Sequence, residues 1–408
     1  MSTPLNRAPG PTLLWLAVVV LTGMNLRPFL TAIGPLGPPI QSATGMGLTA
    51  MSWLTLLPMG LMGVGALLAP GTLRRWGARR VVGVSMLLIA LGCALRIVAG
   101  AGSVLLLSAA ICGAGVALVQ GVFPGILKRQ FPLHVAPMMG LYSAALMGGG
   151  ALGAQWSPLS VQLGLDWQAA LAQWALPVLV ALPLVWYALR EQSEASTASV
   201  SAVGNSSNAT NWLLRRPRTW LLMACFGLVN GGYASAVAWL APYYQGHGMS
   251  AIASGSLVAI MAVAQACAAL LLPLLASRGG PDRRPWLWLT LACQAVGFAL
   301  LAWWPDAAPR AMAVVLGVGL GGCFALVLVA TLDHLPHPMQ AGALSAQMQG
   351  GGFVIAALAP WVVAQLHGAS GGFQAGWLMH LGCVAVVTLL VAQLAPQRYA
   401  QAMRAPAS

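Results

Sequence analysis

The stretch Leu141–Pro158, LYSAALMGGGALGAQWSP, has a counterpart at 343–360, ALSAQMQGGGFVIAALAP. In each copy a Ser-Ala pair precedes three consecutive glycines and a proline, and Ser143 matches Ser345, 202 residues later. Other apolar stretches match at nearly the same spacing, since Pro70 corresponds to Pro273. Because small residues let helices pack closely, these matches predict two repeats made of tightly packed helices.

The composition excludes a soluble protein. Only 6% of the 408 residues are charged, 59% are hydrophobic, and the mean hydropathy is +0.81, whereas a soluble domain carries about a quarter charged residues. The seven cysteines show no metal-binding spacing, and no nucleophile–base pair is recognisable. We therefore expect an integral membrane protein with no metal, no cofactor and no catalytic residues.

The apolar segments are long enough to cross a bilayer as helices, and the sequence predicts twelve of them. A polar stretch between the sixth and seventh divides the chain into a six-helix bundle at 1–189, a flexible cytoplasmic linker at 190–218 and a second six-helix bundle at 219–408. The expected spans are 12–38, 50–71, 81–99, 102–127, 137–160, 168–189, 219–245, 252–276, 286–304, 310–332, 341–366 and 374–395.

The basic residues predict the topology. If the N-terminus is placed inside, sixteen of the nineteen basic residues fall in inner loops and ends, Arg96 and Arg310 fall outside, and Arg27 is left in the core. This asymmetry follows the positive-inside rule for twelve spans with both termini cytoplasmic. The net charge of +13 is then explained by topology and by contact with anionic lipid headgroups, without a nucleic-acid partner.

Two six-helix repeats joined by a cytoplasmic linker describe the major facilitator architecture. We therefore predict an all-α membrane protein with this fold, whose substrate site lies between the repeats near the midplane of the membrane.

Arg27 is the main candidate for the substrate site. It lies about 15 residues into the first apolar segment, which at about 1.5 Å per residue is roughly 22 Å deep in a core about 30 Å thick. A charge there usually marks a substrate pathway, and its fork of donors suits a small anion. The alternative is a structural charge satisfied by backbone carbonyls. Pro28, which follows it, predicts a bend in this helix.

Other polar residues of the apolar segments could complete the site. Asn230 and Tyr233 are three residues apart and share one helical face, and they occupy the repeat position equivalent to the Arg27 segment. Tyr142 would reach the same cavity if its helix lines it. Gln120 and Gln349 are further candidates, although hydrogen bonding between helices is the alternative role for each.

Asp333 and His334 end the tenth span and are candidates for an inner gate or a proton relay; the alternative is an ordinary solvated helix end. The glycine triplets at 148–150 and 350–352 lie too deep in apolar segments for phosphate binding, and we interpret them as packing and gating surfaces.

Four strings closely resemble the bacterial cyanate transporters, the CynX/NimT group of the major facilitator superfamily. They are NLRPFLTAIGPLGPPI at 25–40, LYSAALMGGGALGA at 141–154, NGGYASAVAWLAPYY at 230–244 and GLGGCFALVLVATLDH at 319–334. The resemblance implies a transporter of the bacterial inner membrane that moves cyanate, a small linear anion. A sister branch exports 2-nitroimidazoles.

These features together predict alternating access, with Arg27 binding the anion. Because no acidic residue lies in the predicted core, facilitated diffusion or anion exchange is more economical than proton symport. Other possibilities are an exporter of 2-nitroimidazole-like or other small drugs in which Arg27 is structural, an anion channel, and a membrane-embedded enzyme or receptor. Carriers of this build generally act as monomers.

Overall fold

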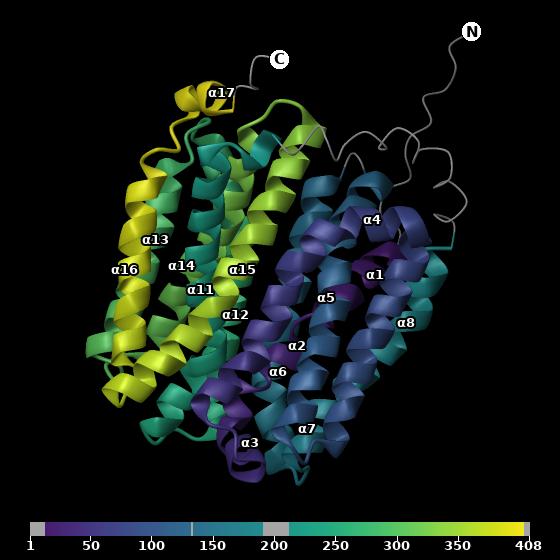
Figure 1. Cartoon of the computed structure of the whole chain (residues 1–408), viewed down its shortest axis with the longest axis vertical. Helices are drawn as coiled ribbons and strands as arrows, with labels where there is room; N and C mark the ends of the chain where they lie inside the picture. Colours follow the sequence, from purple (N-terminus) through teal and green to yellow (C-terminus); the bar gives the residue numbers. More distant parts are fainter. Residues whose placement is uncertain (1–12, 132–133, 191–211, 404–408) are drawn as a thin grey trace.

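In the computed structural model, residues 13–131, 134–190 and 212–403 are described, and within them the regular elements are all helices (Figure 1). The N-terminal half, residues 13–190, contains α1 Leu13–Met24, α2 Pro28–Thr31, η1 Gly34–Leu36, α3 Gly37–Thr44, α4 Leu48–Ala94, η2 Leu95–Val98, α5 Gly102–Gln130, α6 Val135–Gln162, α7 Trp167–Ala172 and α8 Ala175–Ala188. The C-terminal half, residues 212–403, contains α11 Pro217–Gly246, α12 Ala251–Arg278, α13 Arg284–Trp303, α14 Pro309–Asp333, α15 Pro338–Ser370, α16 Gln374–Val391, η4 Pro396–Arg398 and α17 Tyr399–Ala402.

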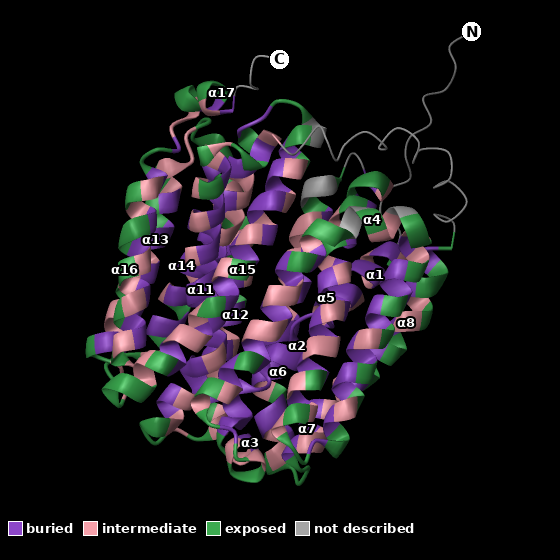
Figure 2. Ribbon diagram, in the orientation of Figure 1, coloured by how far each residue is buried: buried purple, intermediate pink, exposed green. Residues whose placement is uncertain are grey.

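The two halves lie side by side in Figure 1, with α17 at one end of the bundle and α3 at the other. We call these ends the α17 side and the α3 side. Most buried residues lie where helices face one another, and most exposed residues lie at the ends and on the outer surface of the bundle (Figure 2). The predicted domain limits at 189 and 219 stay a prediction, and most of the predicted linker lies outside the described residues.

Eleven helices of the described residues are long and apolar enough to span a membrane. The prediction of twelve spans differs by the segment 137–160. That segment forms α6, which has 28 residues and is long enough to span, although it is not among the eleven. The all-helical, multi-pass architecture is as predicted.

Two segments differ in detail from the expected pattern. The second and third spans are joined by helical residues in α4 rather than by an open loop, and α4 is kinked at Gly77, where φ is 73°. This backbone conformation is accessible to glycine because it has no Cβ. The sixth span is divided into α7 and α8 around Trp174.

The glycine triplets pack helices together as predicted. Gly149 of α6 lies directly on the backbone of Met24 in α1, and Gly352 of α15 lies against Phe226 in α11. The two repeats therefore use the same motif for the same helix pair. Gly148 differs, since a Cβ built on it would meet no atom within 4 Å.

Candidate functional site

Arg27 lies in a break of the first span. Helix α1 ends at Met24, and the chain resumes helical geometry at Pro28 with the single turn α2. Proline cannot donate the hydrogen bond that would continue α1, and its fixed φ suits the first position of a new helix. The predicted bend is therefore present, and it places Arg27 between two helical pieces, with only 5% of its surface exposed.

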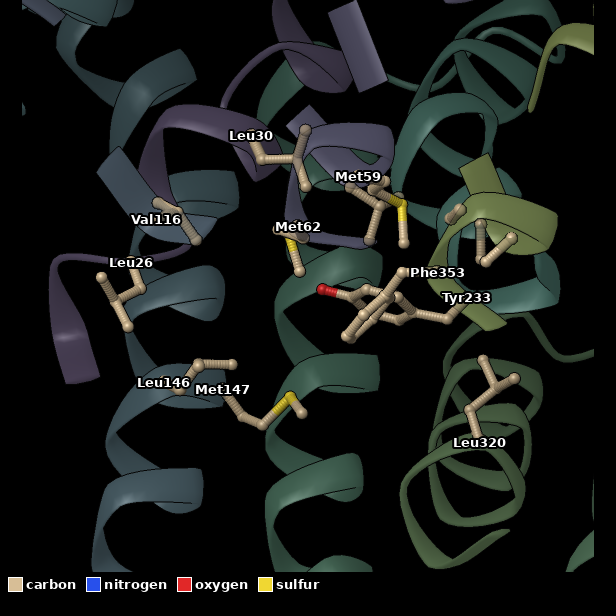
Figure 3. Packing of buried hydrophobic residues seen from close by; sticks show 14 of the residues in the cluster. Leu26, Leu30, Met59, Met62, Val116, Leu146, Met147, Tyr233, Leu320 and Phe353 are labelled. Atoms are coloured by element: carbon tan, nitrogen blue, oxygen red, sulfur yellow. The ribbon is translucent and has the colours of Figure 1, made fainter. Parts of the chain in front are cut away.

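Tyr233 of α11 is the partner of Arg27 across the boundary between the two halves. Nη1 of Arg27 donates a hydrogen bond of 2.9 Å to the Tyr233 hydroxyl, and the guanidinium carbon lies 4.9 Å from the centre of the Tyr233 ring. In Figure 3 the Tyr233 hydroxyl points away from Leu320 of its own half and toward Met62 of the other half. Two residues separated by 206 positions thus meet in the interior. The sequence predicted both for the same site but not their contact.

The bonding of Arg27 is incomplete. Its Nε is buried and has no hydrogen-bond partner, and none of the ion pairs found among the described residues involves it. A guanidinium offers several N–H donors and no acceptor, and a buried charge without a counterion is costly. The side chain therefore keeps donor capacity for an additional acceptor.

Tyr142 of α6 is the second incompletely bonded group near Arg27. Its hydroxyl is buried without a partner, while its ring packs against Phe123, with ring centres 5.3 Å apart. It lies within electrostatic range of Arg27, and Gly150 of the same helix approaches the Arg27 side chain, since a Cβ on it would lie 3.4 Å from Cβ of Arg27. A ligand bound at Arg27 would therefore find a free hydroxyl close by.

Three other candidates do not reach Arg27 in this conformation. The Asn230 amide donates to the Phe226 carbonyl of its own helix at 2.8 Å. Gln349 bonds only to Ser345, one turn earlier in α15. Gln120 is half-buried on α5, and no hydrogen bond of its side chain is found among the described residues. Their proposed part in the site stays a prediction.

The two candidate gating residues have separate surroundings. Asp333 forms an ion pair of 3.1 Å with Arg283, a residue of the same half. His334 is not a solvated helix end, as the alternative interpretation expected, because it is only 2% exposed. Its Nδ1 donates to the Ala330 carbonyl at 2.6 Å, and its ring stacks on Tyr399 of α17 at 3.8 Å. Burial lowers the pKa of His334 to about 4, so the imidazole is neutral at neutral pH.

Arg96 corrects the prediction that Arg27 is the one basic residue in the interior. The positive-inside pattern predicts that Arg96 lies outside with Arg310, but its side chain is only 1% exposed. Nη1 donates to the Phe29 carbonyl at 2.8 Å and Nε donates to Ser108 Oγ at 3.1 Å. The one sequence signal is the apolar run Leu95, Ile97, Val98 around it, which is unusual for an arginine exposed to water.

Three hydrogen bonds join the two halves on the α3 side, and we call them the α3-side latch. Gln245 Nε2 donates to the Pro35 carbonyl at 2.9 Å, Ser256 Oγ donates to Gln155 Oε1 at 2.7 Å, and Thr49 Oγ1 donates to Gln365 Oε1 at 3.0 Å. The hydrogen bond between Arg27 and Tyr233 also joins the two halves. The latch is not predictable from the sequence because polar residues near helix ends are common.

A mainly apolar pocket lies near the latch. Its walls come from both halves, including Leu30, Met51 and Trp239. The latch holds the two halves together on the α3 side.

Removal of the latch hydrogen bonds should let the two halves separate on the α3 side. We expect the combined substitutions Gln245→Ala, Gln155→Ala and Gln365→Ala to lengthen the distance between the halves there, because each hydrogen bond contributes about 0.5–1.5 kcal/mol. Spin labels at positions 42 and 369, in a background without the native cysteines, would report this distance. Gln173→Ala is the matched control, since Gln173 bonds only within the N-terminal half. Unchanged distance distributions would rule out a latch role.

Two helical halves with matching glycine motifs, a buried cation at their boundary and a closed end define a membrane transporter built from repeats. The family model of the Major Facilitator Superfamily matches residues 14–360 of this chain. The chain therefore belongs to the major facilitator superfamily, and it is a multi-pass secondary transporter of small molecules.

Two curated relatives from Escherichia coli K12 are similar along almost the whole chain. The cyanate transport protein CynX is 43% identical over 386 residues, covering 95% of this chain and 98% of its own. The 2-nitroimidazole transporter is 30% identical over 378 residues, covering 92% of this chain and 93% of its own. The predicted resemblance to the CynX/NimT group is thus confirmed, with CynX the more similar of the two.

Solved transporters share the fold. The xylose transporter XylE from E. coli in an inward-open conformation superposes with a TM-score of 0.71 at 14% identity, covering 93% of this chain and 94% of its own. The nucleoside transporter NupG gives a TM-score of 0.69 at 13% identity, covering 94% of this chain and 99% of its own. At such identities the likeness concerns the fold alone.

Proposed function

We propose that this protein moves a small anion, with cyanate as the first candidate, across the bacterial inner membrane by alternating access of its two halves. The observation that carries the proposal is the state of Arg27. Its guanidinium is buried at the boundary between the halves, forms no ion pair with the carboxylates of the described residues, and keeps Nε without a partner. A permanent positive charge in such a place is stabilised most directly by an anionic ligand.

Cyanate suits the donors available at this place. It is a linear triatomic anion whose two terminal atoms both accept hydrogen bonds. One end would take Nε and Nη1 of Arg27, where Nη1 now donates to the Tyr233 hydroxyl. The released Tyr233 hydroxyl and the unpartnered Tyr142 hydroxyl would then donate to the anion. Asn230, Gln120 and Gln349 would join only after a change of side-chain conformation.

Displacement of Tyr233 would link binding to movement. The Arg27–Tyr233 bond is a contact between the halves near the middle of α11, and the latch bonds are at the α3 side. An anion that takes the place of the Tyr233 hydroxyl removes the first of these contacts. Because the described carboxylates all lie at helix ends or in loops, we propose facilitated diffusion or anion exchange rather than proton symport.

The orientation follows from the basic residues. Most of them lie toward the α17 side, and we propose that this side is cytoplasmic, with both termini inside, by the positive-inside rule. We also propose that the monomer is the transporting unit, because the site is built from the two halves of one chain.

A second candidate substrate is a 2-nitroimidazole, the compound named for the relative at 30% identity. The specific observation in its favour is the apolar surroundings of the Tyr233 ring, where Met59, Met62, Met147 and Phe353 gather (Figure 3). Such walls suit a planar heteroaromatic ring. In this case Arg27 would bind the nitro group or serve as a structural charge.

Counterflow of labelled cyanate in proteoliposomes tests the proposal. We expect internal unlabelled cyanate to accelerate entry of the label, and we expect dissipation of the proton gradient at fixed membrane potential to leave the rate unchanged. Excess nitrate, bicarbonate and 2-nitroimidazole serve as competitors, and we expect 2-nitroimidazole to compete weakly. Absence of cyanate counterflow together with counterflow of 2-nitroimidazole would favour the second candidate. A slower rate of cyanate entry when a protonophore dissipates the proton gradient would contradict the uncoupled mechanism.

A further inference from the structure

The broken segment that carries Arg27 contains a backbone carbonyl that its own helix does not satisfy. In a continuous helix the Ile33 amide would donate to the carbonyl of Phe29. Here the Ile33 amide instead donates to the Leu30 carbonyl at 3.4 Å, because α2 is a single turn that ends at Thr31. Within a membrane such a freed carbonyl requires a partner from elsewhere in the protein.

Arg96 supplies this partner. Its Nη1 donates to the Phe29 carbonyl at 2.8 Å, and its guanidinium carbon lies 5.8 Å from the centre of the Phe29 ring. A charged donor forms a stronger and shorter hydrogen bond than a neutral one. The position of Phe29, only two residues after Arg27, is therefore held by a side chain from the end of the third span.

The Arg96 side chain is itself held in place. Its Nε donates to Ser108 Oγ at 3.1 Å, and Ser108 in turn donates to the Leu105 carbonyl at 2.9 Å. Both Arg96 and Ser108 are at most 1% exposed. A guanidinium fixed at two of its nitrogens has little freedom to follow a moving carbonyl, so it sets the carbonyl's position.

A second helix confines the same segment. Gly150 and Gly153 of α6 approach Arg27, Pro28 and Thr31 so closely that a Cβ on Gly153 would lie 2.6 Å from the Pro28 Cα. The segment is thus held by α6 through close packing and by Arg96 through its hydrogen bond. Packing fixes the separation of the segment from α6, whereas the directional bond to the Phe29 carbonyl fixes its rotation, and rotation decides where the Arg27 guanidinium points.

We infer that Arg96 is a positioning residue for substrate binding: by holding the Phe29 carbonyl, it orients the Arg27 guanidinium toward the boundary between the halves. The inference rests on the proposed function, since it assigns Arg96 an effect on the substrate only through Arg27.

The test compares Arg96→Met, Arg96→Lys and Ser108→Ala by cyanate counterflow in proteoliposomes, at equal amounts of folded protein. Arg96→Met keeps an unbranched apolar stem and removes the donors. We expect it to raise the KM for cyanate about tenfold or more with a much smaller change in maximal rate. We expect Arg96→Lys, which keeps a charged donor, to recover part of this loss, and Ser108→Ala to raise KM by less than Arg96→Met.

Gln294→Leu is the matched control. Gln294 is fully buried and donates to the Gly319 carbonyl at 3.1 Å, joining two helices of the other half. We expect it to lower thermal stability without raising KM. A similar rise in KM for Gln294→Leu and Arg96→Met, or no rise for Arg96→Met, would overturn the inference. If Arg27→Ala raises KM and Arg96→Met does not, only the role of Arg96 fails; if Arg27→Ala leaves KM unchanged, the proposed function fails with it.

Discussion

Substitution Arg27→Ala is expected to reduce the affinity for cyanate by about 100-fold or more. Truncation of one partner of a buried, hydrogen-bonded charge pair costs about 2–5 kcal/mol, and each 1.4 kcal/mol corresponds to about tenfold in affinity. Because Arg27 is the buried cation that bonds across the boundary between the halves, no other side chain at this place replaces its charge. Counterflow of labelled cyanate over a range of concentrations measures the effect.

Two comparisons make the Arg27 result specific. Arg27→Lys keeps the charge but loses the planar fork of donors, so we expect an intermediate loss. Arg310→Ala removes an exposed guanidinium at the start of α14 and should leave counterflow unchanged. Equal counterflow by the wild type and Arg27→Ala would show that Arg27 is a structural charge and would favour a neutral substrate.

Gly149→Ala is expected to destabilise the protein by about 3 kcal/mol or more and to abolish transport. The Cβ would overlap the carbonyl of Met24, and Cα of Met24 would lie only 2.8 Å from it. Overpacking typically costs about 1–3 kcal/mol when side chains can move, and here the obstacle is backbone. Helix α6 must then move away from α1, directly beside the break that carries Arg27. Thermal unfolding in detergent and counterflow measure the two effects.

The neighbouring glycine is the control for this prediction. A Cβ on Gly148 meets no atom within 4 Å, so Gly148→Ala should be neutral or slightly stabilising, because alanine restricts the unfolded chain and favours a helix by about 0.5–1 kcal/mol. If Gly149→Ala destabilises the protein and Gly148→Ala does not, the loss of stability comes from close packing at Gly149 and not from a general effect of alanine in this motif. Equal stability of the two variants would refute the packing role of Gly149.

Much of the fold could be predicted because the signals are local. Apolar segments of sufficient length, a strongly asymmetric distribution of basic residues and a repeated glycine motif each occupy a limited window of sequence. The break at Arg27 was also predictable, since Pro28 removes a helical hydrogen bond whatever surrounds it. The segment 137–160 was expected as a span for the same kind of reason, and it forms the 28-residue helix α6.

The candidate site was predictable only in part. Arg27 and Tyr233 were both expected in the interior, but Asn230, placed on the same face as Tyr233, turns its amide back to the Phe226 carbonyl. A helical face restricts the direction of a side chain but does not choose between a distant ligand and a carbonyl one turn away. Arg96 was misplaced because a helix end is normally a place where arginine reaches water, and the free carbonyl of Phe29 was not visible in the sequence.

The amino-acid sequence is sufficient to predict a helical membrane transporter with two related halves and a charge in its first span, because hydrophobicity, helix breaking and charge asymmetry act over short stretches of chain. Only the folded chain shows which residues meet: Tyr233 at the Arg27 guanidinium, Arg96 at the Phe29 carbonyl, and the three polar pairs of the α3-side latch. These contacts join residues that are far apart in the chain, so their geometry depends on how the helices pack together and is not encoded in any one segment.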